Sequence, residues 1–197
     1  MDTQLFISYM RHMAATHYQI RHGVTEDGRP RKAFFRANSE MEMQQGIAVD
    51  ASYPCMVLAP LYGRYSKQRS GTDDMMTVGF EIRMYCPPGD FDAIENARAA
   101  CKRIGEQIIA KIEDEADMMQ NCAALPLFDI ATVRWDETGP INENEYGCRF
   151  SFLVGDEAWE EGSTDFEAIF PGYDEDEGGL YVGESLLMLG DSVLSFD

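Results

Sequence analysis

About seven helical turns of regularly spaced apolar residues occupy the middle of the chain, between residues 94 and 119. Apolar residues recur there every three or four positions, which places them on one side of an α-helix, and charged residues occupy the other side. The apolar side consists of Ile94, Ala97, Cys101, Ile104, Ile108, Ile112, Ala116 and Met119. A helix with one long apolar side must be covered by a second layer, so this segment requires a sheet or further helices to pack against it.

Strand patterns on both sides of the helix supply that second layer. Apolar residues alternate with others over 77–86, which predicts a half-buried strand. Its apolar side carries Val78, Phe80, Ile82, Met84 and Cys86, and its other side carries Gly79, Glu81, Arg83 and Tyr85. A second alternating run over 147–154 places Cys148, Phe150, Phe152 and Val154 on one side. The apolar run 53–59, which ends before Pro60, predicts a third strand.

Shorter patterns complete the sequence up to residue 155. They predict an amphipathic helix over 3–17, a loop or hairpin tip over 26–32, a short strand over 34–36, and a brief helix that Asn38 or Ser39 caps and that runs to Gln44. Asp90 or Asp92 can cap the long helix. We interpret residues 63–72 as a polar, basic loop, residues 127–135 as a strand and residues 136–145 as a turn-rich connector.

The order of these elements predicts the fold class. A helix is followed by strands, then by the long helix and by further strands, and hairpin-like links lie on both sides of the long helix. This order is typical of an α+β fold. We predict a mainly antiparallel β-sheet packed against the long α-helix and the N-terminal helix, followed by an acidic C-terminal extension.

Charge divides the chain into two parts. The whole sequence has 16 basic and 35 acidic residues and a formal net charge of −19. Residues 156–197 contain 13 acidic and no basic residues, so residues 1–155 carry a net charge of only −6. We therefore predict a body over 1–155 and an acidic extension over 156–197. Because the extension also contains many large apolar residues, we expect it to pack on its own body or, as the sharper hypothesis, to dock on a neighbouring subunit.

Two oppositely charged runs are candidate sites of interaction with a subunit or partner. The basic run contains Arg64, Lys67 and Arg69, and the acidic run contains Asp174, Glu175, Asp176 and Glu177. Opposite charges on different parts of one chain favour head-to-tail contacts between copies, which close into rings when the rotation permits. The alternative for the basic run is a solvated hairpin tip. The alternative for the acidic run is a diffuse attraction of cations, because it lacks the spaced oxygen ligands of a calcium-binding loop.

The sequence contains no pattern typical of an enzyme or a cofactor site. His12, His17 and His22 are five residues apart, so on a helix they rotate away from one another and form no metal-binding side. The five cysteines are scattered without a Cys-x-x-Cys pair, which argues against zinc and against a disulfide framework. No glycine motif typical of a phosphate site occurs. We therefore expect a non-enzymatic protein with no catalytic residue, metal or cofactor.

The net charge and the N-terminal residues indicate which partners and which compartment to expect for the chain. A net charge of −19 argues against a protein that binds nucleic acid, since such proteins neutralise phosphates with Lys and Arg. The first ten residues lack the basic and apolar regions of a signal peptide, and no window approaches the ~18 apolar residues of a membrane span. We expect a soluble protein of a reducing compartment that does not contact a membrane.

In the order of its elements and in their residue patterns, the sequence resembles the tail-terminator and neck (head–tail joining) proteins of tailed bacteriophages and related contractile injection systems. The resemblance covers residues 1–155. It rests on the N-terminal helix, the strand at 53–58, a polar loop, the alternating strand from Val78, the break at Pro87 and Pro88, the long helix that begins near Asp90, and the final hairpin that ends with 144–152.

The resemblance implies a structural protomer that assembles with copies of itself into a hexameric ring. Such a ring caps the tail tube or joins it to the head connector, contacts other tail or neck proteins, and has no enzymatic activity. It implies a virion component that assembles in the cytoplasm of a bacterial host, with DNA passing through a negatively charged lumen. The acidic extension departs from the small members of that family, so the position in the particle stays open.

Two other functions stay open. The first is an acidic binding module, such as an inhibitor or a nucleic-acid mimic that occupies a basic partner protein. The second is an enzyme whose carboxylates act on a small substrate. The size of the assembled protein separates a ring from a mimic, and a turnover that is lost when carboxylates are substituted would identify the enzyme.

Overall fold

A computed structural model describes the following parts of the chain: residues 3–26, 28–45, 50–67, 72–118, 127–142 and 144–159, and five short strand segments between 173 and 193. The chain divides into two compact units, Met1–Glu160 and Glu161–Asp197. Each unit is described by itself.

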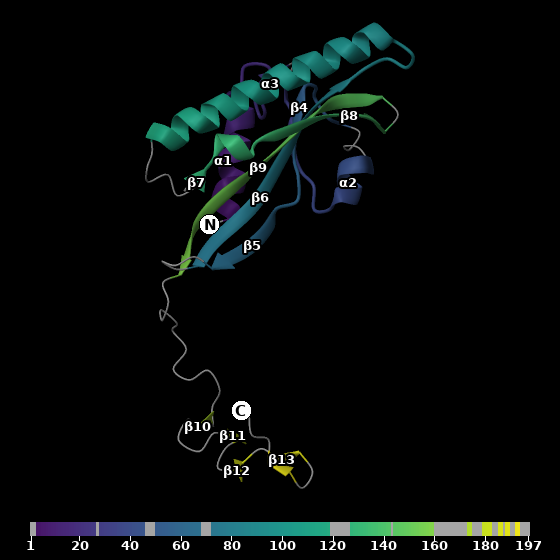
Figure 1. The fold of residues 1–197 in the computed structure, drawn as a ribbon. Coiled ribbons are helices and arrows are strands. Elements are labelled where there is room, and N and C mark those ends of the chain that lie inside the picture. The colour runs from purple at the N-terminus through teal and green to yellow at the C-terminus, as the bar shows by residue number, and fades with distance from the viewer. Residues whose placement is uncertain are drawn as a thin grey trace. The chain divides into compact units, whose positions relative to one another are not determined.

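A seven-stranded sheet forms the centre of the first unit (Figure 1). Its strands are β3 (Phe34–Arg36), β4 (Cys55–Leu58), β5 (Tyr62–Lys67), β6 (Thr72–Tyr85), β7 (Leu127–Phe128), β8 (Arg134–Ile141) and β9 (Glu145–Trp159). The two longest strands, β6 and β9, pair antiparallel and form the central ribbon. β4 and β5 pair with the outer edge of β6, and β7 and β8 pair with the outer edge of β9, all antiparallel. β3 runs parallel to β4.

Helices pack on both sides of the sheet. α1 (Thr3–Thr16) and the long α3 (Phe91–Met118) cover the side to which the apolar residues of β6 and β9 point. We call this the helix side. The short α2 (Glu40–Gln45) lies on the opposite side, where Met43 packs against Val57 and Ala59. We call that the α2 side. The hairpin β1 (Thr25–Glu26) and β2 (Arg29–Pro30) and the 3₁₀ helix η1 (Ile130–Thr132) complete the described part of the unit.

Aromatic rings fill the core on the helix side. Phe80 of β6 and Phe150 of β9 are paired in the sheet, and their stacked ring centroids are 5.3 Å apart. Phe152 meets Phe80 edge-on, with a centroid distance of 6.4 Å. Gly105 of α3 lies directly over Phe150, since a Cβ atom at residue 105 would be 2.0 Å from the ring. The missing side chain therefore allows α3 to approach the sheet closely.

Side-chain caps mark the starts of two helices, as the sequence predicts. At the start of α3, Asp90 Oδ1 accepts a hydrogen bond from the backbone N–H of Ala93 at 2.9 Å. At the start of α2, Ser39 Oγ accepts from the N–H of Glu42 at 3.2 Å. The Glu42 carboxylate accepts in turn from the N–H of Asn38 at 2.7 Å. This reciprocal arrangement allows a helix of only six residues to form at a defined place.

The structure confirms the predicted α+β class, with a mainly antiparallel sheet against α3 and α1. The alternation over 77–86 and 147–154 is also confirmed. The residues placed on the apolar side of these strands are buried, namely Val78, Phe80, Ile82, Cys86, Cys148, Phe150, Phe152 and Val154, while Met84 is partly buried.

Two segments predicted to be irregular contain strands instead. The described ends of segment 63–72, interpreted as a loop, belong to β5 and to the start of β6. In the segment 136–145, interpreted as a connector, residues 136–141 belong to β8 and Glu145 begins β9. The strand predicted over 127–135 is divided into β7, η1 and the start of β8. β5 and β8 lie at the edges of the sheet, where polar residues are tolerated because one side of each strand pairs with no described strand.

The second unit contains short antiparallel strands. They are β10 (Tyr173–Asp174), β11 (Gly179–Val182), β12 (Ser185–Leu186), β13 (Met188–Leu189) and β14 (Ser192–Val193). β11 pairs with both β10 and β12, and β13 pairs with β14. The predicted boundary at residue 155 lies within β9, which ends at Trp159. Among the described helices of the chain, none has the length and apolar character needed to cross a membrane.

Candidate functional site

A buried cluster of charged residues lies on the α2 side of the central ribbon. Arg83 of β6 is fully buried, and Glu81 and Glu145 are 2% and 3% exposed. Arg83 Nη2 lies 2.9 Å from Glu81 Oε2, and Arg83 Nη1 lies 3.3 Å from Glu145 Oε2. We call these three residues the Arg83 cluster. The two ion pairs compensate the cost of removing the arginine and both carboxylates from water.

Neighbouring groups satisfy further polar atoms of the Arg83 cluster. The Tyr53 hydroxyl donates to Glu145 Oε1 at 2.7 Å, and the Thr138 hydroxyl donates to Glu81 Oε1. Arg83 Nη2 also donates to the backbone carbonyl of Met43 in α2. Burial and the contact with Glu145 raise the pKa of Tyr53, so its phenol remains a neutral hydrogen-bond donor. The cluster thus links α2, β8 and the segment before β4 to the ribbon.

The composition of the Arg83 cluster is that of an acid–base site, but its packing is that of a structural one. Both carboxylates already accept hydrogen bonds from protein groups, and both are buried. A general acid or base must reach the proton that it transfers, within hydrogen-bond distance of a substrate. The cluster therefore fixes the α2 side of the sheet and offers no exposed reactive group.

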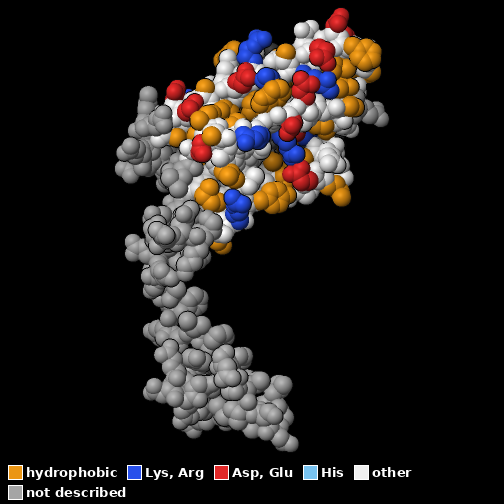
Figure 2. All heavy atoms as spheres, in the orientation of Figure 1, with side chains coloured by type: hydrophobic (Ala, Val, Ile, Leu, Met, Phe, Trp, Pro, Cys, Tyr) orange, Lys and Arg blue, Asp and Glu red, His pale blue; other side chains and the backbone are white. Residues whose placement is uncertain are grey.

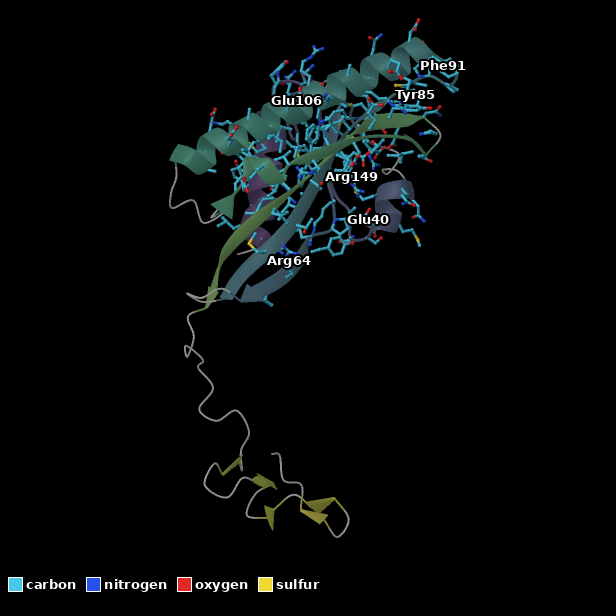
Figure 3. All side chains as sticks on the ribbon, viewed as in Figure 1. Glu40, Arg64, Tyr85, Phe91, Glu106 and Arg149 are labelled. Carbon is cyan, nitrogen blue, oxygen red and sulfur yellow. The ribbon has the colours of Figure 1, made fainter. Side chains whose placement is uncertain are left out.

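A shallow hollow of about 200 Å³ opens on the α2 side, beside α2 itself. We call it the α2 hollow. Its lining is Glu40, Ala59, Pro60, Tyr62, Thr77, Val78, Gly79, Asp136, Arg149 and Ser151. Arg149 Nη2 lies 2.7 Å from Glu40 Oε2, and the two side chains are 31% and 47% exposed (Figure 3). The α2 hollow therefore presents a partly exposed arginine with a more exposed carboxylate bound to it.

Side chains next to the α2 hollow are exposed on the same side of the sheet. The register places Tyr62 beside Thr77, and Arg64 beside Met75. Tyr62 is 54% exposed, and Thr77 and Arg64 are exposed as well. We call Tyr62, Arg64, Met75 and Thr77 the open face. In the space-filling view, hydrophobic and charged side chains are interspersed over the described surface (Figure 2).

The edge of the sheet adjoins the open face. Among the described strands, β5 pairs with β6 alone. An edge strand is the usual place at which sheets join between molecules. Edge and open face together form a continuous surface suited to contact with another protein.

The predicted interaction residues lie only partly within the described residues. Arg64 is an exposed residue of β5, on the open face. Lys67 is the last residue of β5 and Asp174 belongs to β10, and both side chains lie outside the description. Arg69, Glu175, Asp176 and Glu177 lie outside the described residues altogether. The predicted contact between the basic and the acidic run stays a prediction.

Histidines and cysteines form no group of three or more metal-binding side chains with Asp or Glu in the described part of the chain. His12 is exposed, and His17 and His22 are partly buried. The described cysteines are free and buried, namely Cys55, Cys86, Cys101 and Cys148, and Cys122 lies outside the described residues. Burial raises the pKa of each of these four thiols, that of Cys148 to about 11. They therefore remain protonated near neutral pH and act as small core residues.

A second hollow of about 360 Å³ lies between the end of α1 and α3. Its lining is Met13, Thr16, His17, Tyr18, Gln107, Ile108 and Lys111. His17 Nε2 is 3.0 Å from Gln107 Oε1, and Lys111 Nζ is 3.0 Å from Glu115 Oε1. Apolar surface predominates in the rest of the lining, so this hollow offers few of the polar groups that orient a ligand.

Sequence reasoning missed the Arg83 cluster and the pair of Arg149 with Glu40. The alternation correctly placed Glu81 and Arg83 opposite Phe80, but a half-buried strand implies that this other side faces solvent. α2 covers it instead. The available signal was a pair of opposite charges two residues apart on one side of a strand, because such a pair can neutralise itself when another element covers it.

No protein-family model matches this chain, and a search of curated proteins finds no match either. The fold and the surfaces described above are therefore the basis for assigning a function.

Proposed function

We propose that this protein is a structural subunit that assembles with copies of itself into a ring, as a tail-terminator or neck component of a phage or phage-like particle. It acts without enzymatic chemistry, in a virion that assembles in the bacterial cytoplasm, in contact with other tail or neck proteins. Support comes from the α+β fold, which is the fold that the resemblance of residues 1–155 implies, and from the surfaces available for assembly.

The observation that carries the proposal is the unequal covering of the sheet. On the helix side, α1 and α3 bury the apolar residues of the ribbon. On the α2 side, burial extends over the Arg83 cluster, while Tyr62, Arg64 and Thr77 of the open face are exposed. A side that is partly covered and lies beside an edge strand of the described sheet is suited to a head-to-tail contact, in which one surface meets a different surface of the next copy.

Charge supports a ring through which DNA passes. A net charge of −19 on each subunit repels the phosphate backbone, so DNA can move along a lumen of such subunits without adhering. The same charge opposes assembly of the subunits, so the contacts between them must include basic groups. Arg64 on the open face is such a group.

Native mass spectrometry of the full-length protein tests the proposal. We expect a discrete ring, with six copies as the number that the resemblance implies. Thr77→Glu places a carboxylate on the open face, where it opposes the contribution of Arg64, and should convert the ring to monomers. Asn96→Glu adds the same charge at an exposed position of α3 and should leave the ring intact.

The alternative function predicts a different result in the same experiment. A protein that stays monomeric at all concentrations and captures a basic protein would be an acidic binding module or nucleic-acid mimic. That outcome would refute the ring.

A further inference from the structure

The ion pair at the α2 hollow is more exposed than the ion pairs of the Arg83 cluster, so another carboxylate can more easily replace its own. Arg149 and Glu40 are 31% and 47% exposed, whereas Arg83 is completely buried. An exposed pair contributes little to stability, about 0–1 kcal/mol, because water and salt compete for both charges. Another carboxylate can therefore replace Glu40 on Arg149 without disturbing the fold. Arg149 itself projects from the central ribbon, which holds it in place.

The shape of the α2 hollow leaves room beside this arginine. Its floor includes the small residues Ala59, Gly79 and Ser151. A Cβ atom at residue 79 would lie 3.2 Å from the carbonyl oxygen of Phe150 and 3.4 Å from the Cβ of Ala59, so a larger residue there would be tightly packed. Tyr62 and Pro60 add apolar surface to the lining. The hollow therefore combines a site for a carboxylate with a place for an adjoining apolar side chain.

The α2 side is also more basic than the rest of the chain. Arg64, Arg134 and Arg149 lie on it by the strand register, against the carboxylates of Glu40 and Asp136. Arg134 Nη1 donates to the backbone carbonyls of Ala131 and Val133, at 3.0 and 2.9 Å. Arg64 forms no ion pair with a described carboxylate. With the Arg83 cluster included, these cations and carboxylates balance in number. On a chain of net charge −19, this side therefore repels an acidic partner less than the rest of the chain does.

We infer that the α2 hollow and the adjoining open face bind the acidic segment 161–197 of a second copy, with a carboxylate of that segment replacing Glu40 on Arg149. The inference rests on the proposed assembly of copies and names the contact. The segment has the matching chemistry, since it contains 10 carboxylates, no Lys or Arg, and apolar residues next to acidic ones, such as Phe166 between Asp165 and Glu167. In the free subunit Glu40 occupies the place of the incoming carboxylate.

Two substitutions in the full-length protein test this exchange, because they should change the strength of self-association in opposite directions. Glu40→Gln removes the competing carboxylate, so self-association measured by dilution in mass photometry should tighten several-fold. Arg149→Gln removes the receptor for the carboxylate, so self-association should weaken about tenfold, the loss expected for one charge-assisted hydrogen bond. If the pair only supports α2, both substitutions weaken association or leave it unchanged, and the inference fails.

Matched controls separate the pair from a general effect of charge. Glu95→Gln and Arg103→Gln make the same two charge changes at exposed positions of α3, and neither should change self-association by more than about twofold. A control that shifts association as far as its counterpart at the hollow would attribute the effect to net charge and overturn the inference.

Neutralisation of the acidic run identifies the ligand. A full-length variant with Asp174→Asn, Glu175→Gln, Asp176→Asn and Glu177→Gln should associate more weakly and should lose its response to Glu40→Gln. If it keeps the ring and that response, the segment is not the ligand, although the proposed function stands. If the unmodified protein is monomeric, the proposed function itself fails. Binding of duplex DNA that Arg149→Gln abolishes would assign the surface to nucleic acid and overturn the inference.

Discussion

The two sides of the central ribbon are buried by different physical means. On the helix side, Phe80 and Phe150 stack under α3, and the stabilisation comes from apolar area and close packing. On the α2 side, the same two strands bury Arg83 with Glu81 and Glu145, and the stabilisation depends on the two ion pairs that the one arginine forms. The stability of an apolar core falls in proportion to the apolar groups that are removed. The stability of a buried charged cluster falls sharply when any one of its members is removed, because the remaining charges are left without a partner.

Removal of the arginine from the α2 side should cause the largest loss in the free energy of unfolding. Arg83→Met leaves Glu81 and Glu145 buried without their cation and removes a donor from the carbonyl of Met43. We expect a loss of about 4 kcal/mol in the free energy of unfolding, measured by urea denaturation monitored by circular dichroism.

A neutral version of the whole cluster sharpens this result. The triple variant Glu81→Gln, Arg83→Met and Glu145→Gln keeps acceptors for Thr138 and Tyr53 but contains no buried charge. It should recover most of the loss, since replacing a complete buried ion cluster costs little. A single Arg83→Met variant as stable as the wild type would show that pairing of charges does not govern this side.

Overpacking of the helix side should cause a smaller loss in the free energy of unfolding. Gly105→Ala places a methyl group against the ring of Phe150, so α3 and the sheet must separate. We expect a loss of about 2 kcal/mol in the same denaturation assay, as in other overpacked cores.

Helix propensity alone predicts the opposite sign for that substitution, a gain of about 1 kcal/mol, because alanine is the better helix former. Ala99→Gly, at an exposed position of α3, measures the propensity effect separately. A stabilised Gly105→Ala variant would mean that α3 is not pressed against Phe150.

The smallest effect should come from the hydrogen bond between Tyr53 and Glu145. Tyr53→Phe removes the donor and should cost about 1.5 kcal/mol near neutral pH. Burial and Glu145 raise the pKa of this phenol in the folded state. The stability that it contributes is therefore present below the unfolded-state pKa of about 10 and is lost as the pH rises above it.

Unfolding measured between about pH 9 and pH 11 tests this pH dependence. The wild type should lose stability more steeply than Tyr53→Phe above about pH 10, because the Tyr53 phenol, whose pKa is raised in the folded state, ionises on unfolding and the variant lacks it. The buried thiols contribute the same loss to both proteins, since their pKa values are also raised. Equal slopes in the two proteins would contradict the proposed environment of Tyr53.

The helix side could be predicted from the sequence because its pattern is local. Apolar residues repeat every three or four positions in α3 and every two in β6 and β9, and such repeats have few interpretations. The α2 side could not be predicted in the same way. Its burial depends on α2, a helix of six residues that lies at least 36 residues in sequence from every member of the Arg83 cluster. Period two cannot show whether the polar side of a strand is later covered by such a distant element.

The edge strands and the α2 hollow escaped prediction for a related reason. Segments with Gly63, Ser66 or the pair Gly139 and Pro140 have low strand propensity, and they become strands because a long neighbour offers hydrogen bonds. Arg64 was predicted as an interaction residue from charge alone, and it is exposed. Arg149 was not, since only the fold brings it to Glu40, 109 residues away.

The length of β6 and β9 has a mechanical consequence. The 14 residues of β6, at about 3.3 Å each, extend about 46 Å beside an antiparallel partner. When two such strands are pulled along their length in opposite directions, the backbone hydrogen bonds between them share the load in shear. They must then break together, whereas a force applied at one end would break them one after another. A subunit built around this ribbon can carry tension along one axis while its short outer strands yield.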